Sequence, residues 1–190
     1  MITLKRLVMV LLVVSFLAGC DLYGKIGGED TNIQGALPPL LHGTWIFPSS
    51  GNISESYIID NAAVIDNGAV IANGTVQYDG GASGNGTSYK GSIVFVSNYS
   101  STSGVIIIKY TEAPAYSNAY GIYNGNPFFG IYYRNLKNNT VQLANSTNLG
   151  DNSGSPDTAT LDEAIAKFTR LNMVNYVDWS NVNPQSKVQQ

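Results

Sequence analysis

The chain has 190 residues, of which 44% are hydrophobic and 12% are charged, and its formal net charge is −3. This length suits one domain with one core. The basic residues beyond Arg6 are scattered, with no two adjacent in the chain. That scatter excludes a phosphate-binding surface of clustered Lys and Arg, so we expect no nucleic-acid partner.

The first 19 residues have the pattern of an export signal. Lys5 and Arg6 precede an apolar run, Leu7 to Leu17. As a helix this run would span about 16 Å, roughly half of the hydrocarbon core of a bilayer, which is too short for a comfortable membrane span. The charges before the run and the small residues after it predict a cleaved signal peptide over residues 1–19.

Cys20 is the only cysteine, so it cannot form an internal disulfide. The run Leu17-Ala18-Gly19-Cys20 resembles the lipobox of bacterial lipoproteins. The resemblance implies cleavage before Cys20, a diacylglyceryl group on its sulfur and a membrane as the partner of that lipid. We therefore expect a protein of the bacterial cell envelope, at the outer membrane or cell surface rather than the inner membrane. The alternative is a secretory signal followed by a free cysteine.

Residues 20–40 are rich in glycine and contain Pro38 and Pro39. This composition predicts a flexible tether behind the cysteine that the lipoprotein resemblance implies to be lipidated, so the lipidated cysteine and tether span residues 20–40 and the folded domain spans residues 41–190. An N-terminal strand or plug around Leu37 to Leu41 is the alternative.

Short β-rich runs follow, separated by turn dipeptides such as Asn73-Gly74 and Asn124-Gly125. Asn and Gly tolerate the positive φ of tight hairpin turns. The spacing predicts a mainly β fold, an antiparallel meander barrel of about eight strands. The predicted strands are 43–47, 54–65, 69–78, 88–98, 104–111, 128–135 and 140–146.

The middle strands are apolar on both faces, with Ile93, Phe95 and Ser97 expected on one face and Val94 and Val96 on the other. Both faces must therefore be covered. An amphipathic helix over about 159–171 is available to pack outside, with Thr160 and Glu163 as a capping box. Its apolar stripe comprises Leu161, Ala164, Ile165, Phe168 and Leu171. After it, 173–179 is a final strand or a strap, and the last ten residues are expected to fray.

The run Leu41-His42-Gly43-Thr44-Trp45 resembles the Gly-x-Trp signature of lipocalins, eight-stranded cups that hold small apolar ligands. The resemblance implies that Trp45 plugs the closed end, that Gly43 admits a neighbouring backbone, and that Arg134 or Arg170 stacks on Trp45. The plain alternative is that Trp45 is a core aromatic at the start of a strand. The stretches 130–136, 141–145 and 160–169 are also similar to small spirochaete lipoproteins of unknown function, which implies no chemistry.

The residues offer little for catalysis. His42 is the only histidine, no Gly-x-Ser-x-Gly motif is present, and a zinc site with several His or Cys ligands is excluded by counting. We therefore expect no enzyme, no cofactor and no metal. A weaker alternative is an envelope enzyme with Glu55 or Glu112 as acid or base, which would need a second carboxylate nearby.

Binding remains as a function. The loop from Glu112 to Asn126 is longer than a hairpin needs and carries Tyr116, Tyr120 and Tyr123, which we expect to contact a ligand or partner. The favoured hypothesis is a barrel that binds a small hydrophobic or amphipathic ligand in its mouth. The alternative is a structural or adhesive lipoprotein whose loops contact a host or envelope protein. A packed interior favours the second, and a connected apolar cavity favours the first.

Overall fold

The computed structural model describes residues 35–48, 53–62, 64–66, 69–72, 74–80, 88–112, 125–147, 149 and 156–189. These residues belong to one compact unit, Asn32–Gln190. The predicted signal peptide, Cys20 and the tether up to residue 34 lie outside the described residues. Within the described part of the chain, no helix has both the length and the apolar character needed to cross a membrane.

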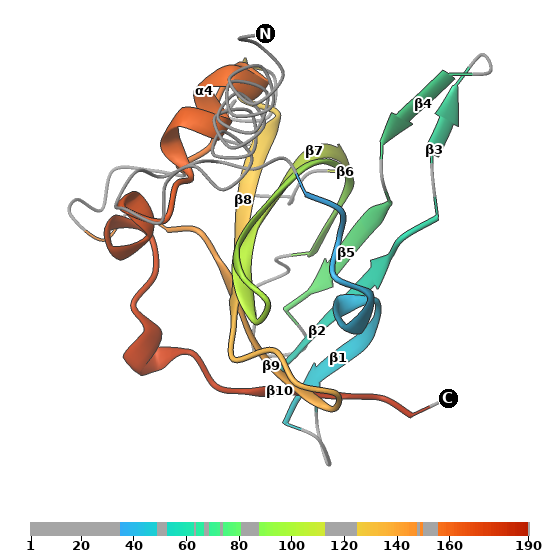
Figure 1. Ribbon diagram of the computed structural model, residues 1–190, viewed down its shortest axis with the longest axis vertical. Helices are drawn as coiled ribbons and strands as arrows, with labels where there is room; N and C mark the ends of the chain where they lie inside the picture. The colour runs from blue at the N-terminus through green and yellow to red at the C-terminus, as the bar shows by residue number, and fades with distance from the viewer. Residues whose placement is uncertain are drawn as a thin grey trace, which may run out of the picture. The chain divides into compact units, whose positions relative to one another are not determined.

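Eight antiparallel strands form a closed barrel in the order β1-β10-β9-β8-β7-β6-β5-β2 (Figure 1). Every barrel strand pairs with the next barrel strand along the chain, so the predicted meander barrel is confirmed. The strands are β1 (Gly43–Phe47), β2 (Glu55–Asp60), β5 (Thr75–Asp79), β6 (Ser88–Ser100), β7 (Ser103–Glu112), β8 (Phe128–Arg134), β9 (Thr140–Asn145) and β10 (Gln185–Lys187).

A separate two-stranded sheet, β3 (Val64–Asp66) and β4 (Ala69–Ala72), is inserted between β2 and β5. The prediction had single strands over 54–65 and 69–78, whereas each is divided in two. Gly74 lies at the break, with a φ of +140°, and a Cβ there would come within 2.1 Å of the Asp60 carbonyl oxygen. Glycine is therefore required where the hairpin bends away from the barrel ladder.

Alternating side chains fill the inside of the barrel. Trp45, Ile93, Ile106, Ile131 and Tyr133 are completely buried, and they belong to one continuous inner cluster. Phe129, Ile131 and Tyr133, from the strand predicted over 128–135, are buried in this cluster. The middle of the barrel is therefore a packed core.

A second layer covers the outside of β6 to β9, as the apolar faces of these strands predicted. Its buried residues form what we call the outer cluster: Phe95, Val105, Ile107, Tyr132, Ala144, Ala164, Phe168 and Val177. Phe95 was expected on the same face as Ile93. It lies in the outer cluster instead, because β6 has an irregular register between these two residues that reverses the alternation.

The helix of the outer layer is α4 (Leu161–Lys167), which packs against β8 (Figure 1). Its capping box of Thr160 and Glu163 is confirmed. The helix is shorter than predicted because Phe168 leaves the helical conformation and the Asn172 side chain donates to the Lys167 carbonyl. Leu171, the expected end of the apolar stripe, is consequently 72% exposed.

The segment after α4 forms a strap of short 3₁₀ turns, Asn172–Asn175 and Trp179–Asn181, over the outer cluster. The prediction that the last ten residues fray is wrong, since β10 pairs with both β1 and β9 and closes the barrel. The completely buried Gln185 side chain extends this short strand. Its amide accepts a hydrogen bond from the Leu143 N–H (2.8 Å) and donates to the Leu143 carbonyl (3.3 Å), as a backbone peptide would.

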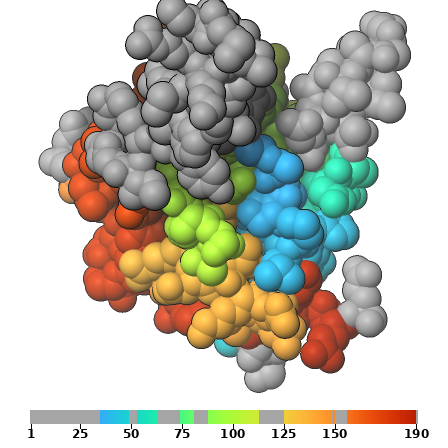
Figure 2. All heavy atoms as spheres, viewed as in Figure 1, coloured from blue at the N-terminus to red at the C-terminus, as the bar shows by residue number. Residues whose placement is uncertain are grey.

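Residues 35–40 had been assigned to the tether, but they pack on the barrel. The Gly35 N–H donates to the Val96 carbonyl at 2.7 Å, the Asn98 side chain donates to the Ala36 carbonyl, and Leu37 is buried in the inner cluster. In the space-filling view, residues 35–42 (blue) lie against the β6–β7 turn (yellow-green) (Figure 2). For these residues the plug alternative describes the structure better than the tether.

Candidate functional site

The barrel has two unlike ends. The connections β1–β2, β5–β6, β7–β8 and β9–β10 lie at one end, which we call the mouth, because successive strands run up and down. The chain enters β1 at the other end, where the 3₁₀ turn Pro39–Leu41 precedes Gly43. We call this the closed end.

Trp45 fills the closed end. Its ring is completely buried, and its Nε1–H donates to the Leu41 carbonyl at 2.8 Å. Leu41 is itself completely buried in the inner cluster, so the plug is made from the start of β1 and the turn before it. An indole that buries its apolar surface while its one N–H donor is hydrogen-bonded can close the end of a barrel without leaving a buried polar group unpaired.

The cation beside Trp45 is Lys187, and the expectation that Arg134 or Arg170 stacks there is wrong. The Lys187 Nζ lies 5.2 Å from the centre of the Trp45 ring, because β10 and β1 pair these two residues directly. Arg134 faces outward at the end of β8, where its Cζ lies 4.3 Å from the centre of the Trp179 ring. Arg170 is exposed beyond the end of α4.

Gly43 makes room for that lysine. Its φ is +133°, and a Cβ at this position would come within 2.6 Å of the Lys187 Cε. The Lys187 Nζ also donates to the Leu40 carbonyl at 3.1 Å, which ties the end of the barrel to the plug. Gly43 therefore has the predicted role of allowing a close approach, although a side chain rather than a backbone approaches.

A continuous row of inward-facing aromatic residues leads from the plug to the mouth. Trp45 pairs with Tyr57, Tyr57 with Tyr78, and Tyr78 with Tyr89 on successive strands. We call these four residues the aromatic row. Strands tilt in a closed barrel, so a row along the hydrogen-bonding direction climbs along the axis. Ring contacts of 4.8 Å (Tyr57–Tyr78) and 5.1 Å (Tyr78–Tyr89) make it one surface.

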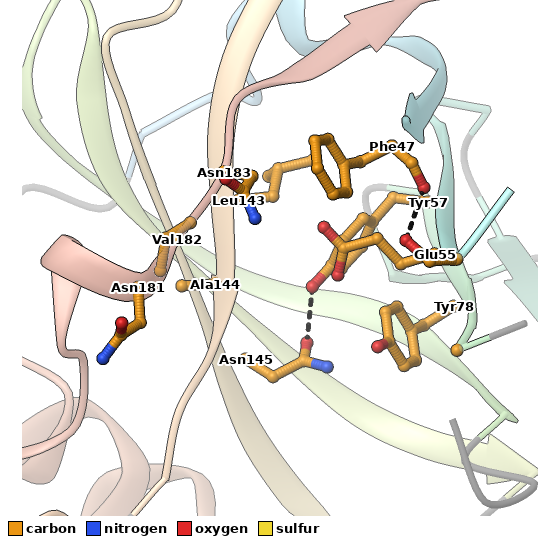
Figure 3. Close-up of a pocket in the computed structure, with 12 residues that line it drawn as sticks. Phe47, Glu55, Tyr57, Tyr78, Leu143, Ala144, Asn145, Asn181, Val182 and Asn183 are labelled. Atoms are coloured by element: carbon orange, nitrogen blue, oxygen red, sulfur yellow. Dashed lines mark hydrogen bonds between the residues drawn. The ribbon is translucent and has the colours of Figure 1, made fainter. Parts of the chain in front are cut away.

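A cavity of about 410 Å³ lies where this row reaches the mouth. We call it the mouth pocket (Figure 3). Its size falls within the range of about 300–1,000 Å³ found for small-molecule sites. Aromatic, aliphatic and polar side chains all contribute to its wall. Its lining residues are Phe47, Ser54, Glu55, Tyr57, Tyr78, Gly80, Leu143, Ala144, Asn145, Asn181, Val182 and Asn183.

Asn145, the last residue of β9, organises the polar side of the pocket. Its Oδ1 accepts hydrogen bonds from the hydroxyls of Tyr57 (3.1 Å) and Tyr89 (2.7 Å). Burial, together with the nearby Glu55 charge, raises the pKa of the Tyr57 hydroxyl well above 10.0, so the group stays protonated and remains a donor. These bonds hold two residues of the aromatic row in fixed positions.

Glu55 is the one charged residue among the described residues that line the mouth pocket. It lies on the same strand face as Tyr57, and its Oε1 accepts a hydrogen bond from the Gln185 side chain. Burial raises the pKa of the Glu55 carboxyl above its usual value of 4.5, while the hydrogen bond from Gln185 partly opposes the shift. The Gln185 side chain thus contacts both the Leu143 backbone, where β10 closes the barrel, and the Glu55 carboxylate in the pocket.

The described lining of the mouth pocket contains none of the other predicted site residues. Tyr116, Tyr120 and Tyr123 are outside the described residues, as is Cys20. Glu112 is exposed and forms an ion pair with Lys90 at 2.8 Å, and Glu55 is the one carboxylate among the described residues of that lining. Among the residues that the structure describes, no three His, Cys, Asp or Glu side chains gather as metal ligands.

Sequence reasoning did not assign a binding role to Tyr57, Tyr78 or Asn145. One signal was available in the sequence. Glu55, Tyr57 and Ile59 follow one another at every second position, so the Glu55 carboxylate had to lie on the same, buried face of the strand as the other two side chains. The contact with Asn145 had no such signal, because Tyr57 and Asn145 are 88 residues apart in the sequence.

Comparison with known proteins gives no relative for this fold and site: the chain matches no protein-family model, no curated protein and no solved structure.

Proposed function

We propose that this protein binds a small amphipathic molecule in the mouth pocket. The observation that carries the proposal is a cavity of about 410 Å³ at the end of a closed barrel opposite its tryptophan plug. Phe47 and Leu143 offer apolar surface, while Glu55 and Asn145 offer polar groups. Small-molecule sites combine apolar surface with convergent polar groups, and a wall that offers both suits an amphipathic ligand.

The packed interior restricts where a ligand of this lipocalin-like barrel would bind. Trp45 and Tyr133 are completely buried in the inner cluster, so the ligand would occupy the mouth rather than a deep cup. We further propose that the barrel is non-catalytic, and that a lipid on Cys20 holds it in the bacterial envelope. The lipobox sequence supports that address.

Native mass spectrometry of the protein purified from its own host, with its natural N-terminus, tests ligand binding. We expect a bound small molecule in addition to the covalent lipid. Asn183→Trp, which places an indole at an exposed position of the pocket wall, should abolish the adduct. Asn175→Trp is the matched control, since Asn175 is exposed but lies outside the lining. A clean apo mass for the wild-type protein would contradict the proposal.

A second function is favoured by the filled interior itself. A barrel packed by its own side chains is a rigid support for loops, which suits a structural or adhesive lipoprotein that contacts an envelope or host protein. Cross-linking on intact cells distinguishes the two functions. The second function requires a protein partner that is captured equally by the wild-type protein and by Asn183→Trp.

A further inference from the structure

The charge on the described wall of the mouth pocket has one sign. Among the described residues that line the pocket, Glu55 is the one charged side chain, and none is Lys, Arg or His. Three of the four connections that join strands at this end of the barrel, 48–54, 80–87 and 113–127, contain no charged residue in their sequence. The fourth, 146–184, contains five acidic and two basic residues, so its net charge is also negative. A carboxylate in this setting repels anionic ligands such as fatty acids and attracts cations.

Glu55 has no cationic partner among the described residues. Its carboxylate instead accepts a hydrogen bond from the side chain of Gln185, an uncharged donor. Partial burial without a counter-ion is unfavourable for a carboxylate, and the raised pKa of Glu55 reflects that cost. A positive group entering the pocket would therefore remove an unfavourable term and add a charge-assisted hydrogen bond.

The neighbours of Glu55 also suit a cation. Figure 3 shows the Glu55 carboxylate beside the Tyr57 hydroxyl, between the rings of Phe47 and Tyr78, which come from the two strands that pair with β2. Tyr57 donates its proton to Asn145, which leaves a lone pair on its oxygen to accept a further hydrogen bond. Aromatic faces attract cations through their quadrupole.

We propose that the mouth pocket binds an organic ammonium cation, with the ammonium group against Glu55 and Tyr57 and an apolar or aromatic body against Phe47, Tyr78 and Leu143. This inference rests on the proposed function, since it names the class of ligand for the same pocket. It differs from the apolar ligand that the lipocalin resemblance implied.

Isothermal titration calorimetry of the full chain with three probes of similar shape tests the inference. The probes are phenethylamine (a cation at neutral pH), 2-phenylethanol (neutral) and 3-phenylpropionate (an anion). We expect phenethylamine to bind about tenfold more tightly than 2-phenylethanol, and the anion not to bind. Glu55→Gln should remove the preference for the amine. Asp162→Asn, which removes one exposed charge on α4, should retain it.

The outcomes separate the two proposals. Equal or tighter binding of 2-phenylethanol or 3-phenylpropionate overturns the ammonium inference but leaves the pocket as a ligand site. Preference for the amine that survives in Glu55→Gln also overturns it, since another group must then hold the cation. Failure of all three probes to bind at up to about 10 mM contradicts the ammonium inference, while the native mass of the protein decides the proposed function independently.

Discussion

The two ends of the barrel use the same row of aromatic residues in opposite ways. At the closed end, Trp45 is completely buried and its one polar atom is bonded to a backbone carbonyl. At the mouth, Tyr78 is half-buried beside a cavity, and the Tyr57 hydroxyl bonds to a side chain, Asn145. One end of this barrel is therefore filled by a packed side chain, whereas the other contains an open pocket.

Of the substitutions at the two ends, Trp45→Ala should lower the free energy of unfolding most. Removing a buried indole leaves a cavity and an unpaired Leu41 carbonyl, so we expect the free energy of unfolding to fall by about 3–5 kcal/mol. Urea denaturation followed by circular dichroism measures the change. Val174→Ala, at a side chain that is 68% exposed, is the control and should change little. A loss below about 1 kcal/mol would show that Trp45 is not the plug.

Gln185→Leu should have the second-largest effect on stability, since Gln185 holds β10 against β9, where the barrel closes. The substitution leaves the buried Leu143 N–H without its partner and removes the bond to Glu55. We expect a loss of about 2–3 kcal/mol in the free energy of unfolding by urea denaturation. Ser186→Ala, on the next residue of β10, is the control. Equal stabilities of the two variants would mean that β10 closes the barrel through its backbone alone.

Asn145→Ala tests the mouth, and it should lower the free energy of unfolding by less than Gln185→Leu does. The hydroxyls of Tyr57 and Tyr89 lose their shared acceptor, but water at the pocket can replace it. We therefore expect the free energy of unfolding to fall by about 1 kcal/mol. The same denaturation experiment applies, with Asn138→Ala in the exposed β8–β9 turn as the control. A cost as large as that of Trp45→Ala would remove the contrast between the two ends.

Glu55→Gln should have the smallest effect on stability, and one that depends on pH. The folded-state pKa of Glu55 is raised, so the folded protein holds this proton more tightly than the unfolded chain does. The stabilisation is fully present below the unfolded pKa near 4.5, and it is lost as the pH rises through the folded pKa. The free energy of unfolding of the wild-type protein should therefore fall over this range relative to Glu55→Gln.

Denaturation of both proteins at about pH 4 and about pH 7 measures that difference, and taking it between the two proteins cancels the other titrating groups. Asp162→Asn serves as the control for removing a negative charge. A wild-type protein that gains stability with pH relative to Glu55→Gln would reverse the sign and place Glu55 beside a favourable partner.

Local patterns predicted much of the fold. The turn dipeptides and the runs between them indicated the barrel, and the capping box placed the start of α4 at Thr160. The helix end was less predictable, because Leu171 continues the apolar stripe while the Asn172 side chain ends the helix by bonding to the Lys167 carbonyl. The position of Phe95 depended on an irregularity in β6 register that alternation does not reveal.

The candidate site was the least predictable part. The closed-end residues Gly43 and Trp45 lie in a recognisable motif, but the partner of Trp45 is Lys187, a residue in a segment expected to fray. The mouth pocket joins Glu55, Tyr78 and Asn145 from β2, β5 and β9. Contacts between such distant strands depend on which strands close the barrel, and short sequence patterns report only on neighbouring residues.

The sequence by itself determined the class of the fold, the capping of its helix, the need for an outer layer and the scarcity of catalytic groups. These properties depend on residue type and on short periods along the chain. The tertiary structure decided the rest: β10 closes the barrel through the amide of Gln185, Lys187 covers Trp45, and Glu55 lies in the mouth pocket without a counter-ion in the part of the chain that the structure describes. Strand register and tilt set these contacts, since they determine which distant side chains share one face.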